Sequence, residues 1–122
     1  MTVITFGGDE SWSSPRWAFA RLAKATSLFV NEGSDMEVLE GAVARDALSF
    51  PSLDPARACR LARALRAGAS WLREDLTGHD YENDLDETFA ESLLPLAAQL
   101  TSVLEPWTDP RERVSVTRRP TR

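Results

Sequence analysis

The stretch DPARACRLARALRAGASWLREDLTG, residues 54–78, decides the fold. Asp54 before Pro55 is typical of a helix start, because the carboxylate caps free backbone N–H groups and proline fits the first helical position. Gly78 is the natural stop. At 100° per residue, one face of this helix collects Leu61, Leu65, Leu72 and Leu76, with Ala58, Gly68 and Ala69 beside them. The pattern predicts a long helix with that face in the core, Arg63, Arg66 and Arg73 on the opposite face, and Arg60 on one flank near Trp71.

Two further helices are predicted before it. Ser14 followed by Pro15 repeats the start signal and opens a helix that should stop near residues 31–33. Ser34 and Glu37 form a capping-box pattern that opens the next, which should end at residues 50–51. The apolar stripes are Phe19, Leu22, Ala23, Thr26, Phe29 and Val30 in the first helix, and Met36, Leu39, Val43 and Ala47 in the second.

A fourth helix is predicted from about Leu85 to Leu104, with Pro95 expected to kink it. The two ends of the chain differ, because residues 2–6 and 114–117 are short and β-branched. We therefore expect a mainly α fold, a compact four-helix domain with a short two-stranded β element formed from the two termini if these strands pair. The single domain would comprise an N-terminal strand and loop (1–13), a helical core (14–105) and a C-terminal strand with an arginine-rich tail (106–122).

The totals bound the class of protein. The chain has 122 residues, 43% hydrophobic and 27% charged, which suits one folded soluble domain. It has neither an apolar run long enough for a membrane span nor a secretory signal at its start, so we expect a cytoplasmic protein. Cys59 is the lone cysteine and is expected to be a packing residue. The strong preference for arginine over lysine suggests GC-rich codons and a bacterial source.

Charge is arranged in blocks along the chain. Residues 57–73 hold five arginines and no acid, whereas residues 74–110 hold ten acids and no lysine or arginine. The tail, 111–122, again has five arginines. The net charge of −5 argues against general nucleic-acid or membrane binding, although Arg60, Arg63 and Arg66 leave a nucleic-acid contact as a lesser alternative.

The acidic connector around LTGHDYENDLDETF, residues 76–89, is the candidate site. A calcium loop starting at Asp80 would place Leu85 where a glycine is required and Glu87 where an apolar residue is usual. A transition-metal site would need a second histidine beside His79. We therefore predict no metal and no cofactor. His79 with Asp80 or Glu82 resembles an acid–base pair, but no activated nucleophile or phosphate loop accompanies it, so catalysis is disfavoured.

Part of the connector has an ordinary structural explanation. Asp84 and Glu87 have the capping-box spacing for the fourth helix. Glu74 and Asp75 do not, because they lie at the end of a helix where acids are unfavourable. They would either bind a partner or pair with the arginine tail. The predicted partner-binding residues are Glu74, Asp75, Asp80, Tyr81 and Glu82, together with Trp12, which could instead pack on the first helix.

Function follows from elimination and charge. We expect a small acidic protein-binding module whose partner has a basic surface, for instance an inhibitor or immunity-type protein that neutralises a basic bacterial toxin. The alternative is a small-molecule-binding protein or enzyme with a pocket near His79, Tyr81 and Glu82.

Overall fold

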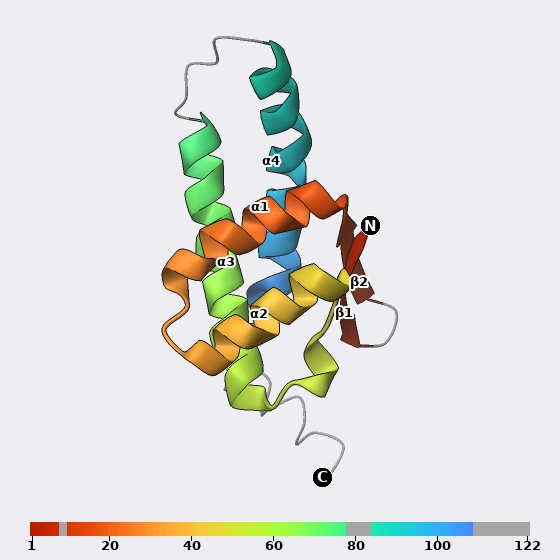
Figure 1. Cartoon of the computed structure of the whole chain (residues 1–122), viewed down its shortest axis with the longest axis vertical. Helices are drawn as coiled ribbons and strands as arrows, with labels where there is room; N and C mark the ends of the chain where they lie inside the picture. The colour runs from red at the N-terminus through yellow and green to blue at the C-terminus, as the bar shows by residue number, and fades with distance from the viewer. Residues whose placement is uncertain (8–9, 78–83, 109–122) are drawn as a thin grey trace.

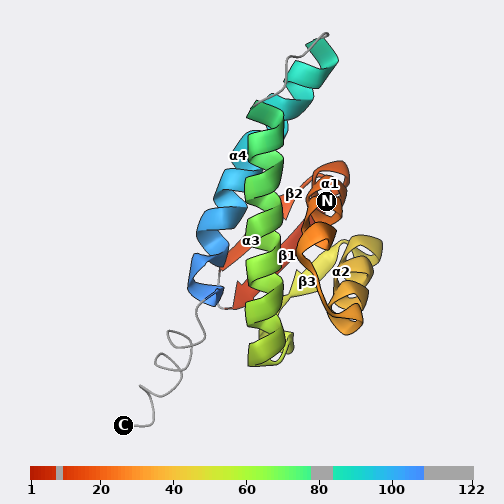
Figure 2. The same ribbon diagram turned by 90° about the vertical axis from the view of Figure 1, so that its left-hand side faces the viewer.

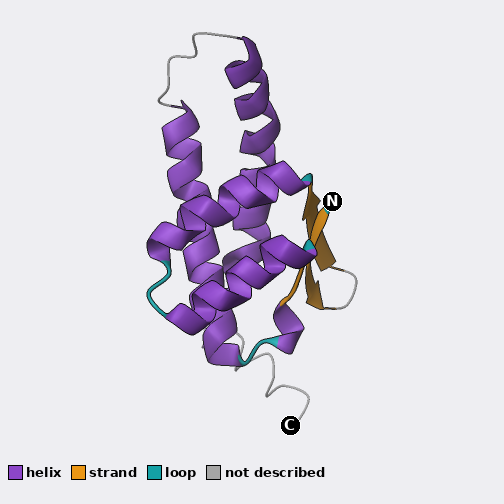
Figure 3. Ribbon diagram, viewed as in Figure 1, coloured by secondary structure: helices purple, strands orange, loops and turns teal. Residues whose placement is uncertain are grey.

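A computed structural model describes residues 1–7, 10–77 and 84–108, with side chains described for 1–7, 10–75 and 91–108. The elements run in the order β1 (Thr2–Gly7), β2 (Glu10–Ser14), α1 (Arg16–Thr26), η1 (Ser27–Phe29), α2 (Gly33–Arg45), β3 (Ala47–Ser49), η2 (Phe50–Ser52), α3 (Pro55–Thr77), α4 (Asp84–Leu104) and η3 (Glu105–Trp107), where η marks a 3-10 turn. The mainly α, four-helix architecture is confirmed (Figures 1 and 3). Among the described residues no helix is both long and apolar enough to cross a bilayer.

Helix α3 is the axis of the molecule and follows the sequence prediction closely. The backbone N–H of Arg57 donates to Oδ1 of Asp54 at 3.0 Å, which confirms the predicted cap. Leu61, Leu65 and Leu72 are almost completely buried, and α3 packs against α4 along one side and α1 along another. Figure 2 shows α3 and α4 side by side, with α1 and α2 on the other side of α3.

Gly68 is the point where α1 crosses α3. A Cβ built on Gly68 would lie 2.6 Å from Oγ1 of Thr26 and 2.7 Å from its Cα, closer than atoms can approach. The Thr26 hydroxyl is also buried and donates to the carbonyl of Leu22 at 2.7 Å, so it is fixed in place. Only glycine allows the two helices to approach this closely.

The sheet corrects the two-stranded prediction. It has three strands in the order β2-β1-β3, with β1 antiparallel to β2 and parallel to β3. Strand β1 buries Thr2, Ile4 and Phe6 and pairs Ile4 with both Trp12 and Leu48. Its partners therefore come from the hairpin beside it and from the segment after α2. The predicted strand at 114–117 lies outside the described residues.

Two of the predicted helix starts are wrong in detail. Ser14 is the last residue of β2 and its hydroxyl donates to the carbonyl of Pro15, so Pro15 itself precedes the first turn of α1. Helix α2 begins at Gly33 rather than after Ser34, and no side chain caps it. The reason is tertiary, because Asp35 in its first turn is buried and turned toward arginines of α3.

The end of α2 also differs from the prediction. Asp46 adopts a left-handed conformation (φ 57°) and ends the helix before Ala47, which belongs to β3. Asp46 then joins the helices to the sheet, because its carboxylate accepts from Arg16 and from the Thr2 hydroxyl, and its carbonyl accepts from the N–H of Val3. The guanidinium of Arg16 is the main cause that lowers the pKa of Asp46.

One continuous core joins all these elements. Its largest fully buried side chains include Phe19, Phe50, Leu65 and Leu100. Cys59 is buried, and its thiol lies 3.4 Å from the carbonyl of Thr108, in agreement with a packing role. In α4 the stripe residues Leu93, Leu100 and Leu104 are buried, and Pro95 lies inside the helix without ending it.

Candidate functional site

The predicted partner-binding acids that the structure describes lie at the end of α3. Glu74 is exposed and Asp75 is half-buried, in the last turn before Thr77. Asp80, Tyr81 and Glu82, as well as His79, fall outside the described residues, so their predicted roles stay predictions. The ends of α3 and α4 run beyond α1 and the sheet as a two-helix extension (Figure 1). Glu74 and Asp75 are therefore on a projecting part of the molecule.

Trp12 does not belong to a surface. Its side chain is only 3% exposed, and its indole N–H donates to the carbonyl of Leu96 at 3.1 Å. The ring also lies 6.3 Å from that of Phe19. Because its indole is buried and hydrogen-bonded within the chain, Trp12 packs in the core and offers almost no surface to a partner. The position of Trp12 before α1 is compatible with partner contact or with packing, and in the structure the side chain packs in the core.

The capping role of Asp84 is compatible with the helix bounds but is not tested. Helix α4 begins at Asp84, one residue before the predicted start. The side chains of Asp84 and Glu87 are not among those described. The proposed capping box therefore remains a sequence prediction.

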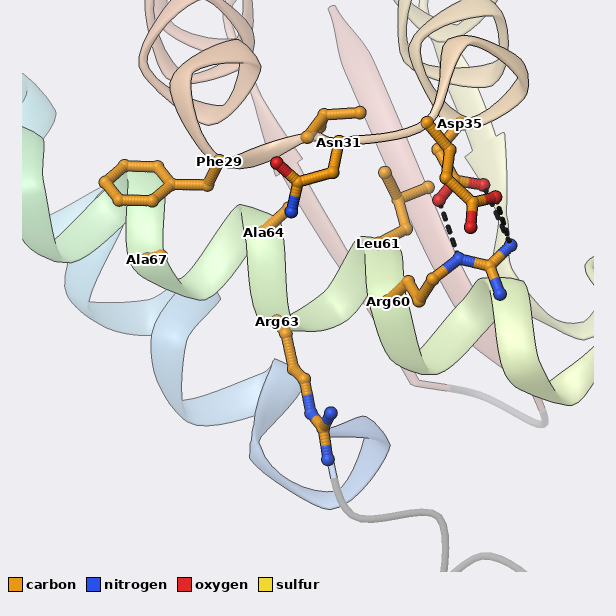
Figure 4. Close-up of a pocket in the computed structure, with 10 residues that line it drawn as sticks. Phe29, Asn31, Asp35, Arg60, Leu61, Arg63, Ala64 and Ala67 are labelled. Carbon is orange, nitrogen blue, oxygen red and sulfur yellow. Dashed lines mark hydrogen bonds and ion pairs between the residues drawn. The ribbon is translucent and has the colours of Figure 1, made fainter.

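A pocket of about 430 Å³ lies between α3 and the connection from α1 to α2. Figure 4 shows Phe29 lying over Ala67 at its apolar end, the amide of Asn31 in the middle, and the Asp35–Arg60 pair at its polar end. Arg63, on the rim, points away from the others, and its Nε donates to the carbonyl of Thr108 at 3.0 Å. Sequence analysis did not identify this pocket.

The polar end of the pocket is an ion-pair cluster. The buried carboxylate of Asp35 accepts from Nε of Arg57 at 3.1 Å and from Nε of Arg60 at 2.9 Å. Nη2 of Arg60 lies 3.3 Å from both Oδ1 of Asp35 and Oε2 of Glu32. Hydrogen bonding from Arg60 is the largest cause that lowers the pKa of Asp35, against the opposing effect of burial. Two acids and two arginines thus neutralise each other where α2 begins.

This cluster has a structural role and explains part of the arginine row on α3. Asp35 is held ionised and its oxygens are already occupied, so it is a poor proton donor or general base. Of the residues in the lesser alternative, a nucleic-acid contact through Arg60, Arg63 and Arg66, Arg60 is engaged by Asp35 and Glu32 within the chain, which weakens that alternative. No local signal predicted the cluster, because Asp35 is more than 20 residues from both arginines along the chain.

A second pocket, of about 400 Å³, lies between α1 and α3 on the other side of η1. We call it the Trp71 groove, and it is lined by Arg21, Lys24, Ala25, Ser27, Leu28, Trp71 and Leu72. Leu28 is 64% exposed and Trp71 is 42% exposed. The sequence placed Phe29 on the buried stripe of the first helix, but the change from α1 to a 3-10 turn after Thr26 leaves both Leu28 and Phe29 exposed.

No metal-binding cluster of three or more histidine, cysteine, aspartate or glutamate residues occurs within 1–7, 10–77 and 84–108. The calcium-loop pattern begins at residues 80–83, outside these ranges, and the side chains of 84–90 are not described, so the expectation that it binds no calcium stays a prediction. No protein family, curated protein or solved structure matches the chain. Its function must therefore be argued from its own surface chemistry.

Proposed function

We propose that the chain is a protein-binding module that engages a basic surface of another protein through the acidic end of its α3–α4 extension. The observation that carries the proposal is the position of Glu74 and Asp75 on helices that continue beyond α1 and the sheet (Figure 1). Glu91, near the start of α4, is exposed as well. Residues 74–110 hold ten acids and no lysine or arginine.

Electrostatics supports a role in association rather than in folding. Acids in the last turn of a helix face its negative dipole end and cost a few tenths of a kcal/mol, roughly. Their presence there is therefore unfavourable for the helix itself. Carboxylates on a projecting surface accelerate the encounter with a basic partner and reject acidic ones. An inhibitor or immunity-type protein that covers the basic groove of a toxic enzyme would use the extension in this way.

The alternative, a pocket formed near His79, Tyr81 and Glu82, draws no support from the described residues. The two pockets described above are lined by other residues of α1, α2 and α3. Within the larger one, the polar groups are mostly satisfied by each other. The pocket near His79, Tyr81 and Glu82 therefore stays a prediction.

The test is affinity capture from the native source with the full chain and with neutralised variants. The variants are Glu74→Gln with Asp75→Asn, and Asp80→Asn with Glu82→Gln. A matched control is Glu37→Gln with Glu40→Gln, which removes two exposed acids from α2. We expect a basic protein to be captured by the wild type and the control, and its association rate to fall about tenfold or more in the first two variants. Equal capture by all forms would refute the proposal.

A further inference from the structure

The Trp71 groove gathers exposed apolar side chains from two elements. Leu28 comes from η1 and Trp71 from α3, while the buried Leu72 forms part of the lining. Single exposed apolar residues are ordinary on a protein surface. Two large ones on opposite sides of one groove form a patch, and such patches mark contact sites. Tryptophan is also the side chain that most often anchors an interface.

Charges of opposite sign flank this patch. Lys24, the only lysine of the chain, is exposed in the last turn of α1 and lines the groove. Asp75 lies four residues after Trp71, so the two share a face of α3, one turn apart. Among the residues that the structure describes, neither Lys24 nor Asp75 has an ion-pair partner. The groove is thus lined by apolar side chains and, on the α1 side, by Arg21 and Lys24, while Asp75 is not part of its lining but follows Trp71 on the same face of α3.

This layout discriminates between occupants. A purely basic partner would be repelled by Lys24 and a purely acidic one by Asp75. The complement is a surface with the same apolar centre and the two charges exchanged. A second copy of the chain, turned by a two-fold rotation about the groove, presents this surface by symmetry, because each contact in such an interface occurs twice.

We propose that the Trp71 groove is the contact through which two copies of this chain form a two-fold symmetric dimer. Leu28 and Trp71 of each copy pack against those of the other, and Lys24 of each faces Asp75 of the other. The dimer does not depend on the basic partner proposed above. Asp75 takes part in both contacts, so the two proposals are distinguished by Leu28→Ala and Trp71→Ala, which should weaken the dimer and leave the capture of a basic protein unchanged.

The first experiment is sedimentation equilibrium on the full chain from about 1 μM to 1 mM, the range in which small interfaces associate. The monomer has a mass of 13.5 kDa. We expect the average mass to rise toward twice that value as the concentration increases. A mass that stays at that of the monomer up to the highest concentration overturns the proposal.

The second experiment tests whether the groove is the interface. It compares substitutions of two neighbouring residues of η1. Leu28 and Phe29 are both exposed on η1, but Leu28 lines the Trp71 groove and Phe29 the other pocket. Leu28→Ala and Trp71→Ala should each raise the dissociation constant about tenfold or more, whereas Phe29→Ala should leave it unchanged. An equal effect of all three, or no effect of Trp71→Ala, overturns the proposal.

The third experiment tests the charge pairing between copies. Lys24→Glu and Asp75→Lys should each weaken self-association about tenfold, because each places like charges opposite one another twice. An equimolar mixture of the two variants should restore association, because every Lys24–Asp75 contact in the mixed dimer again joins opposite charges. Both positions are solvent-accessible, so thermal melts should show folded proteins. A mixture that associates no better than either variant alone overturns the pairing.

Discussion

The two halves of α3 both carry charged side chains, but the surroundings of these side chains differ. In the first half, up to Gly68, the arginines at 57 and 60 are held by Asp35 and the helix is covered by α1, α2 and η1. In the second half, Trp71 and Glu74 are exposed and Asp75 is half-buried, and the helix continues beyond its crossing with α1 (Figure 1). The role of a charged side chain on a helix therefore depends on which elements cover that part of the helix. Gly68 marks the boundary, because α1 crosses there.

The largest change in stability is expected at Gly68, the boundary between the two halves of α3. Gly68→Ala should lower the free energy of unfolding by about 3 kcal/mol, the upper end for overpacking, because the new methyl group would meet backbone atoms of Thr26 that no rotamer change can move. The gain in helix propensity, about 1 kcal/mol, offsets only part of the strain. Urea unfolding measures the change.

Gly33→Ala is the matched control for that substitution. A Cβ at Gly33 has no neighbour within 4 Å, and the residue also lies in a helix. Its stability should change by less than about 1 kcal/mol. If both variants were equally stable, the helices would have room to separate and the boundary would not be fixed by Gly68.

In the first half of α3, the next test removes the carboxylate of Asp35, which pairs with Arg57 and Arg60. Asp35→Asn should cost about 2 kcal/mol, because two arginines lose their carboxylate partner. The value is below that of a fully buried pair because the side chains of Arg57 and Arg60 are 32% and 39% exposed, and water screens them. Glu37→Gln, an exposed acid in the same helix, should change stability by less than about 0.5 kcal/mol. Equal effects would show that the cluster adds nothing to folding.

The carboxylate of Asp35 should also make the stability of the protein depend on pH. The pKa of Asp35 is lowered in the folded state, chiefly by hydrogen bonding from Arg60. A lowered pKa contributes stability above the unfolded value, about 4, and that contribution is lost as the pH falls through the lower folded value. We expect a loss of stability below about pH 4 that is smaller in Asp35→Asn than in the wild type. Urea midpoints measured from pH 2 to 7 test this, and parallel profiles would contradict it.

The sequence predicted the elements that depend on local signals. The start of α3 at Asp54 and Pro55, its leucine face and the approximate span of α4 are all set by capping and periodicity, which act within a few residues. Ser34 shows the limit of such signals. The predicted capping box does not form, and Asp35, in the first turn of α2, pairs instead with arginines of α3. Local preferences are small enough for one buried ion pair to override them.

The sheet and the exposed groove could not be predicted in the same way. Strand β3 has three residues, too few to show an alternating pattern, and it pairs with β1 across more than 40 residues of chain. The exposure of Leu28 arises from the 3-10 turn after Thr26, which no residue pattern indicated. At the candidate site, charge blocks indicated the end of α3, but only the packing of α1 showed that Trp71 lies beside it.

Substitutions in the second half of α3 should change the free energy of unfolding least. Asp75→Asn should change the free energy of unfolding by less than about 0.5 kcal/mol, and the sign should be stabilising, because an acid in the last turn of α3 opposes the helix dipole. Asp35→Asn, the same substitution in the covered half, is the matched comparison and should be clearly destabilising. A thermal melt measures both. If Asp75→Asn were as costly as Asp35→Asn, the end of α3 would be held by internal pairing, for instance with the arginine-rich tail, and the case for Asp75 as a contact residue would be lost. If it is stabilising, the carboxylate lowers the stability of its own helix, which is the expected signature of a side chain that acts in association.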